Sequence, residues 1–318
     1  MRVIDHIKKA EGKTLFSFEI LPPKKGEDIN ALFASIDPLM EFNPAFIDVT
    51  YHREEYEYRK RPDGLMEKVT TRKRPGTVGI CAAIINRYKI DAVPHLICGG
   101  FTKEETENAL IDLAFLGIEN ILALRGDAIK AEGKFIPTPN GNEYATDLIT
   151  QIQEMNHGVY QDKTLESNAK TNFSIGVAAY PEKHFEAPNM NAELHFLKKK
   201  VQLGAEYAVT QMFFDNEKYF RYLELCKSAG IEIPIIPGLK PIATKAQLKV
   251  LPSVFHIDIP EELTKEVLKC KDNAQVKEVG IEWSIQQCKE LMEKGVPDLH
   301  FYTMSRSETT HKIAKALF

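Results

Sequence analysis

Short apolar runs rich in β-branched and aromatic residues alternate along the chain with longer stretches of helical period. This alternation is typical of strand–helix units that build a parallel sheet. It predicts eight strands, at residues 15–20, 46–51, 92–98, 120–125, 173–180, 207–213, 233–239 and 299–304.

The helical pattern is clearest over residues 102–116. Thr102 and Glu105 have the spacing of a capping box, and Leu110, Leu113 and Ala114 fall on one helical face. Similar signals follow most of the predicted strands. Eight strand–helix units in 318 residues fit a closed (β/α)8 TIM barrel better than an open sheet. The missing GxGxxG motif argues against the common dinucleotide-binding open sheet, so we predict an α/β chain whose residues 1–318 form a single barrel.

Two segments are longer than a plain barrel needs. Residues 53–89, after the second strand, are dense in charge and tyrosine, and residues 53–61 are most simply interpreted as a solvated surface. Residues 253–295, before the eighth strand, predict two or three extra helices. We interpret both as insertions into the barrel, with no role assigned to the first. The Gly, Pro and Asn of residues 130–141 predict a loop at the barrel mouth that could cover a ligand.

Composition narrows the class of protein. Hydrophobic residues make up 43% and charged residues 27%, as in a soluble globular chain. The net charge of −4, without a long block of one sign, argues against a nucleic-acid partner. No apolar run is long enough to span a membrane, and the charged amino end is unlike a signal peptide. We therefore expect a cytoplasmic protein whose five widely spaced cysteines are reduced and mostly buried.

Polar residues follow almost every predicted strand. In a (β/α)8 barrel the active site lies at the carboxyl ends of the strands. Seven of the eight strands deliver polar or ionisable groups there: Glu19, Thr50, His95, Arg125-Gly126-Asp127, Tyr180, Gln211, and Tyr302 with Arg306. We expect these side chains to share one rim.

Glu19 is the candidate for acid chemistry. It lies between Phe18 and Ile20, and Pro22 and Pro23 end the strand just after it. Apolar surroundings should raise the pKa of this carboxyl group, which would let it act as a general acid near neutral pH. A glutamate that faces water or pairs with a lysine is the open alternative.

Other residues match ligand groups. Arg125-Gly126-Asp127 offers a cation, a backbone that a flat ring can approach closely, and an anion, although a plain turn with an aspartate cap also has this sequence. The Gln211 amide matches the amide-like edge of a pterin or nicotinamide, but a hydrogen-bonded core glutamine is the simpler interpretation. Lys200 could reach a phosphate, whereas solvated lysines are the default for residues 198–200.

A metal site is the weaker hypothesis for His184, Glu193 and His195. Their spacing matches no HExxH motif, and on a helix Glu193 and His195 would point to different faces. We therefore predict no metal. Tyr180 and Tyr302 could stack on a planar ligand or only close the top of the barrel core.

Seven phrases in order resemble the methylenetetrahydrofolate reductase family over nearly the whole chain. They are FSFEILPPK (16–24), DVTY (48–51), HLIC (95–98), LALRGD (122–127), IGVAAYPEKH (175–184), TQMFFD (210–215) and HFYTMSR (300–306). The resemblance implies a (β/α)8 barrel that holds FAD at its carboxyl rim. It also implies reduction of 5,10-methylenetetrahydrofolate to 5-methyltetrahydrofolate, with hydride from NADH or NADPH, by a ping-pong mechanism.

The resemblance also implies roles for individual residues. Glu19 matches the acid that protonates the folate, and Asp127 matches an aspartate beside the flavin and pterin rings. The implied FAD contacts are Thr50, His95, Arg125, Gly126, Asp127, Tyr144, Ala145, Tyr180, His184, Glu193 and Lys200. The implied substrate contacts are Gln211, Tyr302 and Arg306. Two positions depart from the family pattern. Glu193 replaces an aspartate, and Lys245 lies at about the position where some members have an aromatic residue that stacks on the folate.

Two further expectations concern assembly and control. Such barrels are commonly homo-oligomers, and no regulatory domain is expected after Phe318. The alternatives are a flavin-free pterin-binding barrel, such as a methyltransferase or lyase, and a non-catalytic folate store. A bound flavin that NADH reduces would separate the first hypothesis from both.

Overall fold

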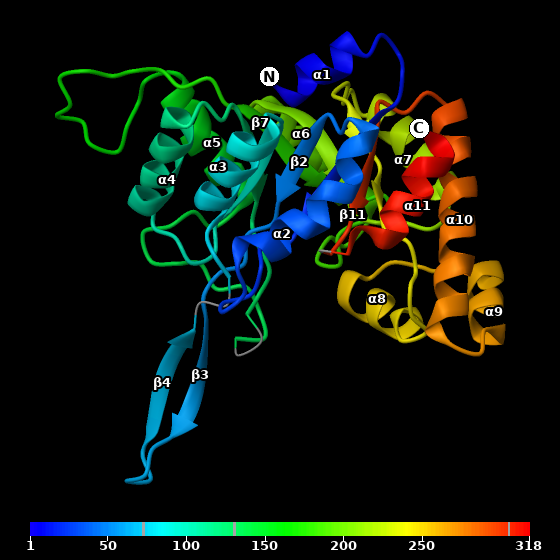
Figure 1. The fold of residues 1–318 in the computed structure, drawn as a ribbon. Helices are drawn as coiled ribbons and strands as arrows, with labels where there is room; N and C mark the ends of the chain where they lie inside the picture. Colours follow the sequence, from blue (N-terminus) through cyan, green and yellow to red (C-terminus); the bar gives the residue numbers. More distant parts are fainter. Residues whose placement is uncertain (72–73, 130–131, 305) are drawn as a thin grey trace.

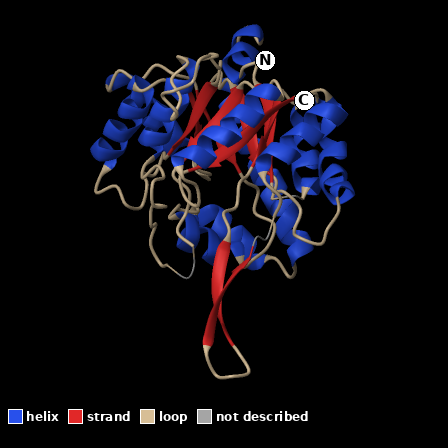
Figure 2. Ribbon diagram, turned by 90° about the vertical axis from the view of Figure 1, so that its left-hand side faces the viewer, coloured by secondary structure: helices blue, strands red, loops and turns tan. Residues whose placement is uncertain are grey.

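The computed structural model describes residues 1–71, 74–129, 132–304 and 306–318, and a parallel sheet that curls into a barrel lies at its centre (Figures 1 and 2). The sheet order is β10-β11-β1-β2-β5-β6-β7-β8-β9. Its strands are β1 (Leu15–Ile20), β2 (Phe46–Val49), β5 (Asp91–Ile97), β6 (Asn120–Leu124), β7 (Ser174–Ala179), β8 (Ala205–Thr210), β9 (Ile235–Ile236), β10 (Gly238–Leu239) and β11 (Asp298–Tyr302). All eight predicted strands are confirmed.

The two shortest strands close the ring. β9 pairs with β8 and β10 pairs with β11, and only Pro237 separates them. Proline has no N–H to give to a ladder, so it divides the predicted seventh strand into two pieces. The Pro237 carbonyl still accepts a hydrogen bond from the His300 N–H at 3.2 Å.

A helix follows each barrel strand and covers the outside of the sheet (Figure 2). In chain order these helices are α2 (Ile29–Ile36), α3 (Thr77–Tyr88), α4 (Lys103–Phe115), α5 (Ala145–Asn156), α6 (Met190–Gln202), α7 (Asn216–Ser228), α10 (Asn273–Glu293) and α11 (Ser307–Leu317). The short helix α1 (Val3–Lys9) precedes β1, and a 3-10 helix, η1 (Asp37–Phe42), follows α2. The (β/α)8 prediction is therefore confirmed, as is the capping box of Thr102 and Glu105 at the start of α4.

The first predicted insertion is shorter than expected. Its last part is the barrel helix α3, because Ile80, Cys81 and Ile84 are buried against the sheet. The added element is an antiparallel hairpin of β3 (Glu55–Lys60) and β4 (Met66–Thr71), which projects from the barrel in Figure 1. The high density of charged residues correctly indicated an added element at the hairpin. The helix α3, which follows it, was wrongly included in the predicted insertion. Residues 72–73 of the predicted insertion lie outside the described residues.

The second predicted insertion also contains a barrel helix. α10 packs on α11 and α7, so only α8 (Gln247–Phe255) and α9 (Glu261–Lys269) are extra. The first of them begins before residue 253, where the insertion was expected to start. Leu251, Leu263 and Val267 from these helices join a small cluster of buried residues that is separate from the main core.

The main core lies between the sheet and its helices, and all five cysteines are buried without disulfides. Inside the barrel, Ser17 connects two ionisable groups. Its hydroxyl donates to Asp298 Oδ2 at 2.5 Å and lies 2.8 Å from His300 Nδ1. Among the helices that the structure describes, none has the length and hydropathy required to cross a lipid bilayer.

Candidate active site at the carboxyl rim

A cavity of about 630 Å³ opens at the carboxyl ends of the strands, within the size range of cofactor and substrate pockets. Every residue that the sequence assigned to cofactor binding lines it: Thr50, His95, Arg125, Gly126, Asp127, Tyr144, Ala145, Tyr180, His184, Glu193 and Lys200. They come from segments up to about half the chain apart. Parallel strands bring their carboxyl ends to one edge, so the convergence predicted for strand-end residues is confirmed for Thr50, His95, Arg125, Gly126, Asp127 and Tyr180.

The turn after β6 forms one wall of the cavity. Gly126 has φ +86°, and a Cβ atom on it would lie 3.1 Å from the Ile97 Cβ. Only glycine takes this conformation without strain. Arg125 Nη1 lies 2.6 Å from Glu186 Oε2, and its guanidinium carbon lies 5.0 Å from the centre of the Phe135 ring. Phe135 belongs to the loop predicted over residues 130–141, of which residues 130–131 lie outside the described residues.

Helix α6 supplies two side chains of opposite charge, Glu193 and Lys200, to the cavity wall. Glu193 accepts a hydrogen bond from the His184 N–H at 3.1 Å, and burial raises the pKa of its carboxyl group. Lys200 Nζ donates to the Ala178 carbonyl at 3.0 Å, and burial lowers its pKa against the opposing charge of Glu193. Lys200 is therefore not the solvated lysine that was the default interpretation. His195 is exposed while Glu193 is buried, as their helical spacing predicted.

Glu19 lies at the end of β1 in a group of four polar side chains. The Thr50 hydroxyl donates to Glu19 Oε1, and His95 Nε2 lies 3.8 Å from Glu19 Oε2. The same His95 nitrogen lies 3.3 Å from Asp48 Oδ2. Burial raises the pKa of Glu19, and the opposing influences of His95 and the Thr50 hydrogen bond are smaller. The side chain is only 13% exposed, so the predicted raised pKa is confirmed and the water-facing alternative is wrong.

Lys240 is a residue of the rim that was not assigned to the site from the sequence. It directly follows β10 and its charge interacts with Glu19, while burial lowers its pKa to about 8. The seventh predicted strand ended at Leu239, one residue short of it, and was the strand to which no polar group was assigned. A lysine that directly follows a predicted barrel strand was the signal available in the sequence.

The three predicted substrate contacts do not line the cavity. Gln211 Oε1 accepts a hydrogen bond from the Met212 N–H at 2.9 Å. The Tyr302 hydroxyl donates to the Thr210 carbonyl at 2.6 Å and so connects β11 to β8. Arg306 is exposed at the start of α11, and its charge helps to lower the Lys240 pKa.

The rim therefore has two halves. The cavity lies over β2, β5, β6 and β7. The other half is formed by Glu19 in β1, Tyr302 in β11, Gln211 directly after β8 and Lys240 directly after β10. Thr50 and His95 belong to the cavity and also contact Glu19, so they lie where the halves meet. Lys245 takes no part in this arrangement, because it is exposed and its Nζ donates to the Leu268 carbonyl at 3.1 Å.

Some cavity residues were not assigned to the site from the sequence. Arg53 and Glu55 come from the charged run that was interpreted as a solvated surface, and that interpretation is wrong for them. His52 also lines the cavity, and burial lowers its pKa. Phe196 and Lys199 extend the wall along α6. A charged surface and a charged pocket wall have the same local pattern, so the sequence did not separate them.

Three comparisons relate the chain to known proteins. The family model described as Methylenetetrahydrofolate reductase matches residues 2–318. The chain is 34% identical over 310 residues to 5,10-methylenetetrahydrofolate reductase of Escherichia coli (strain K12), which covers 97% of this chain and 92% of that protein. It is 32% identical to Methylenetetrahydrofolate reductase (NADH) 1 of Arabidopsis thaliana, covering 96% of this chain and 49% of that one.

The structural comparison supports the fold. A protein from Clostridium thermocellum, described as binding two copies of 5-methyl-5,6,7,8-tetrahydrofolic acid, superposes with a TM-score of 0.56. The match covers 98% of this chain and 97% of that chain at 16% sequence identity.

Proposed function

Because the chain belongs to the methylenetetrahydrofolate reductase family, we propose that it reduces 5,10-methylenetetrahydrofolate to 5-methyltetrahydrofolate with bound FAD and hydride from NADH or NADPH. The observation that carries this proposal is the position of the cavity. Eleven residues expected to hold FAD line it, and a buried carboxyl group with a raised pKa adjoins it.

The chemistry of the cavity wall fits FAD. Arg125, Lys199 and Lys200 are cations of the kind that bind a pyrophosphate. Ile97, Ala123, Leu124 and Ala178 offer apolar surface to a flat ring system, and Gly126 lets the backbone approach it closely. We propose that the eleven residues hold the cofactor in this way. When bound there, FAD supplies the hydride acceptor and donor chemistry that protein side chains lack.

The protein's own contribution to the reaction centres on Glu19. We propose that its carboxyl group donates a proton to the bound folate, which opens the five-membered ring of the substrate. Burial keeps the carboxyl protonated at a higher pH than an exposed glutamate would be, and the Thr50 hydrogen bond orients it. The position of Glu19 beside the cavity supports this role, because the proposed hydride transfer would take place there.

The other rim residues would bind and orient the substrate. Gln211 offers an amide to the pterin edge, and Arg306 offers a cation to a carboxylate. Asp127 provides a negative charge in the cavity wall. These candidates come from strands next to the half of the rim that would hold FAD. We therefore propose that the nicotinamide and the folate use the same face of the flavin in turn, in a ping-pong order. The name of the Arabidopsis relative includes NADH, which favours NADH over NADPH as the donor.

Anaerobic stopped-flow spectroscopy tests the proposal. The purified protein should show a flavin spectrum that NADH or NADPH bleaches without oxygen, and methylenetetrahydrofolate should then restore it. Parallel runs with the two nucleotides identify the preferred donor. A colourless protein that FAD cannot reconstitute, yet that binds folate, would favour the flavin-free pterin-binding barrel instead. If methylenetetrahydrofolate reoxidises the flavin but no 5-methyltetrahydrofolate forms, the reductase chemistry is refuted.

A further inference from the structure

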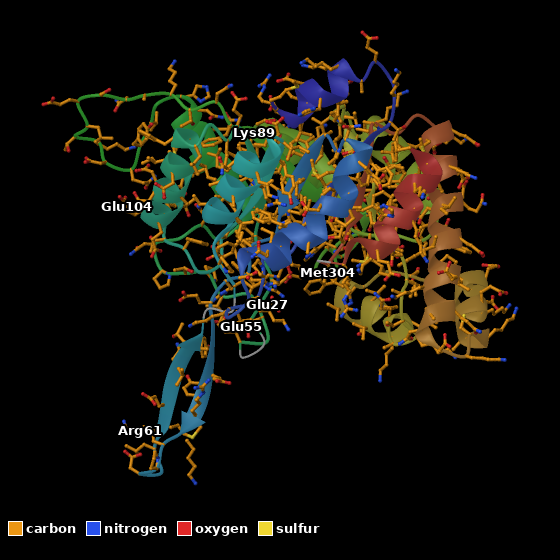
Figure 3. The ribbon with its side chains drawn as sticks, viewed as in Figure 1. Glu27, Glu55, Arg61, Lys89, Glu104 and Met304 are labelled. Atoms are coloured by element: carbon orange, nitrogen blue, oxygen red, sulfur yellow. The ribbon has the colours of Figure 1, made fainter. Side chains whose placement is uncertain are left out.

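The hairpin of β3 and β4 has no covering layer in the described chain. It stands clear of the barrel in two perpendicular views, with Glu55 near its base and Arg61 near its tip (Figures 1, 2 and 3). Tyr58, Leu65 and Met66 are 59%, 64% and 59% exposed. A two-stranded hairpin alone is only marginally stable in water, so six paired residues on each strand suggest a partner.

The backbone of β3 leaves one edge open. The Arg61 N–H donates to the Leu65 carbonyl at 2.8 Å, which places the odd-numbered residues in hydrogen-bonded pairs with β4. The backbone groups of Tyr56, Tyr58 and Lys60 therefore face away from β4. An open edge of this kind is a template for another strand.

We propose that this edge pairs with β3 of a second copy of the chain, antiparallel across a twofold axis at Tyr58. The result is a four-stranded sheet in the order β4, β3, the partner's β3 and the partner's β4. In this register Tyr58 lies opposite the partner's Tyr58, and Tyr56 lies opposite the partner's Lys60. About six backbone hydrogen bonds form, because three residues of each strand have their N–H and C=O groups on the open edge.

Charge selects this register. With the axis at Tyr58, Glu57 lies opposite the partner's Arg59, and Arg59 lies opposite the partner's Glu57. These two side chains are more than half exposed and already contact each other within the strand, with Arg59 Nε donating to Glu57 Oε1 at 2.6 Å. The twofold axis therefore creates two pairs of opposite charge on one face of the sheet. Such pairs favour this partner and this register.

Other pairings place like charges together. Moving the axis to residue 57 puts Glu57 opposite the partner's Glu57, and moving it to residue 59 does the same for Arg59. The open edge of β4 is centred on Lys68, which would face the partner's Lys68 and already lies 3.8 Å from the centre of the Tyr56 ring. Charged residues on an edge strand can also serve to prevent pairing with other chains, but that role does not require the positive and negative charges to be self-complementary. The β3 edge with its axis at Tyr58 is therefore the pairing that the charges favour.

Charge reversal tests the pairing through the molar mass of the full-length protein, measured by sedimentation and by light scattering across a dilution series. Glu57→Arg and Arg59→Glu should each raise the dissociation constant of the association at least about tenfold, because each puts two like-charge pairs across the axis. The double variant Glu57→Arg/Arg59→Glu should recover the wild-type mass. An equimolar mixture of the two single variants should also recover it, because each then faces its complement.

Glu104→Arg makes the same charge change on the body of the barrel, away from the hairpin (Figure 3), and should keep the wild-type mass. If the mixture recovers the wild-type mass, the single variants lost only the pairing, because unfolded hairpins would not associate when they are mixed. A wild-type protein that stays monomeric throughout the series overturns the proposal. So do single variants that keep the wild-type mass, or a mixture and a double variant that both stay dissociated.

Discussion

Replacing Glu19 with glutamine separates the two half-reactions of the proposed mechanism. Glutamine keeps the size of the side chain, and its carbonyl oxygen still accepts the Thr50 hydrogen bond. The substitution removes the proton that the buried carboxyl group can donate and the negative charge near His95. The cavity wall itself is untouched, since Glu19 is outside the set that lines it.

The expected effect is large in one half-reaction only. A positioned general acid contributes about 10²–10⁴ in rate, which corresponds to about 3–5 kcal/mol of activation free energy. We expect Glu19→Gln to slow flavin reoxidation by methylenetetrahydrofolate by this factor. Flavin reduction by NADH should change by less than about threefold, because it requires no proton from Glu19.

The pH dependence gives a second measurement of the same residue. In the proposed mechanism protonated Glu19 is the active form. The wild-type reoxidation rate should therefore fall as the pH rises through the raised pKa of Glu19, and the variant should lack this decrease. Linkage predicts the matching trend in stability. A carboxyl group with a raised folded-state pKa stabilises the fold at low pH, and this stabilisation is lost as the pH rises from the ordinary value of 4.5 through the raised pKa. Unfolding of the variant should not show this loss.

Stopped-flow traces of both half-reactions, recorded from pH 5 to pH 9, check the prediction. Glu182→Gln is the matched control, because burial also raises the pKa of Glu182, which does not line the cavity. It should leave both half-reactions near the wild-type rates. Equal slowing of both half-reactions by Glu19→Gln, or an unchanged pH limb, would refute the role of Glu19 as the acid.

Further substitutions test the cavity wall. Asp127→Asn should raise the flavin potential and change folate affinity together, because it removes a negative charge from the wall; potentiometric titration and folate binding measure the two effects. Lys200→Met should weaken FAD binding at least about tenfold, as measured by fluorescence titration, since it removes a cation from the cavity wall, whereas Lys198→Met, at an exposed position, should leave FAD binding unchanged. Gly126→Ala should lower the free energy of unfolding by about 1–3 kcal/mol, because φ +86° is strained for alanine and its Cβ would crowd Ile97; chemical denaturation checks this.

Local patterns in the sequence determined the barrel and much of its rim. Strand periodicity placed all eight strands, because a buried parallel strand must be apolar along its length. Residues at the ends of those strands meet at one edge in any closed parallel barrel, so Thr50, His95, Arg125-Gly126-Asp127 and Tyr180 could be predicted without knowledge of the strand order. The other five cavity residues were expected as FAD contacts only from the family resemblance. The raised pKa of Glu19 also followed from local features, its apolar neighbours and the prolines after it.

Tertiary structure decided what depends on neighbours distant in sequence. The sheet order places Lys240 within range of Glu19, and the burial that lowers the Lys240 pKa arises only when the barrel closes at Pro237. Packing decides that α3 and α10 are barrel helices, while β3 and β4 leave the barrel altogether. Charge density is the same for a solvated surface, a pocket wall and a pairing edge, because it records composition and not what lies opposite. The structure places Arg53 and Glu55 in the cavity wall, whereas Glu57 lies on the projecting hairpin.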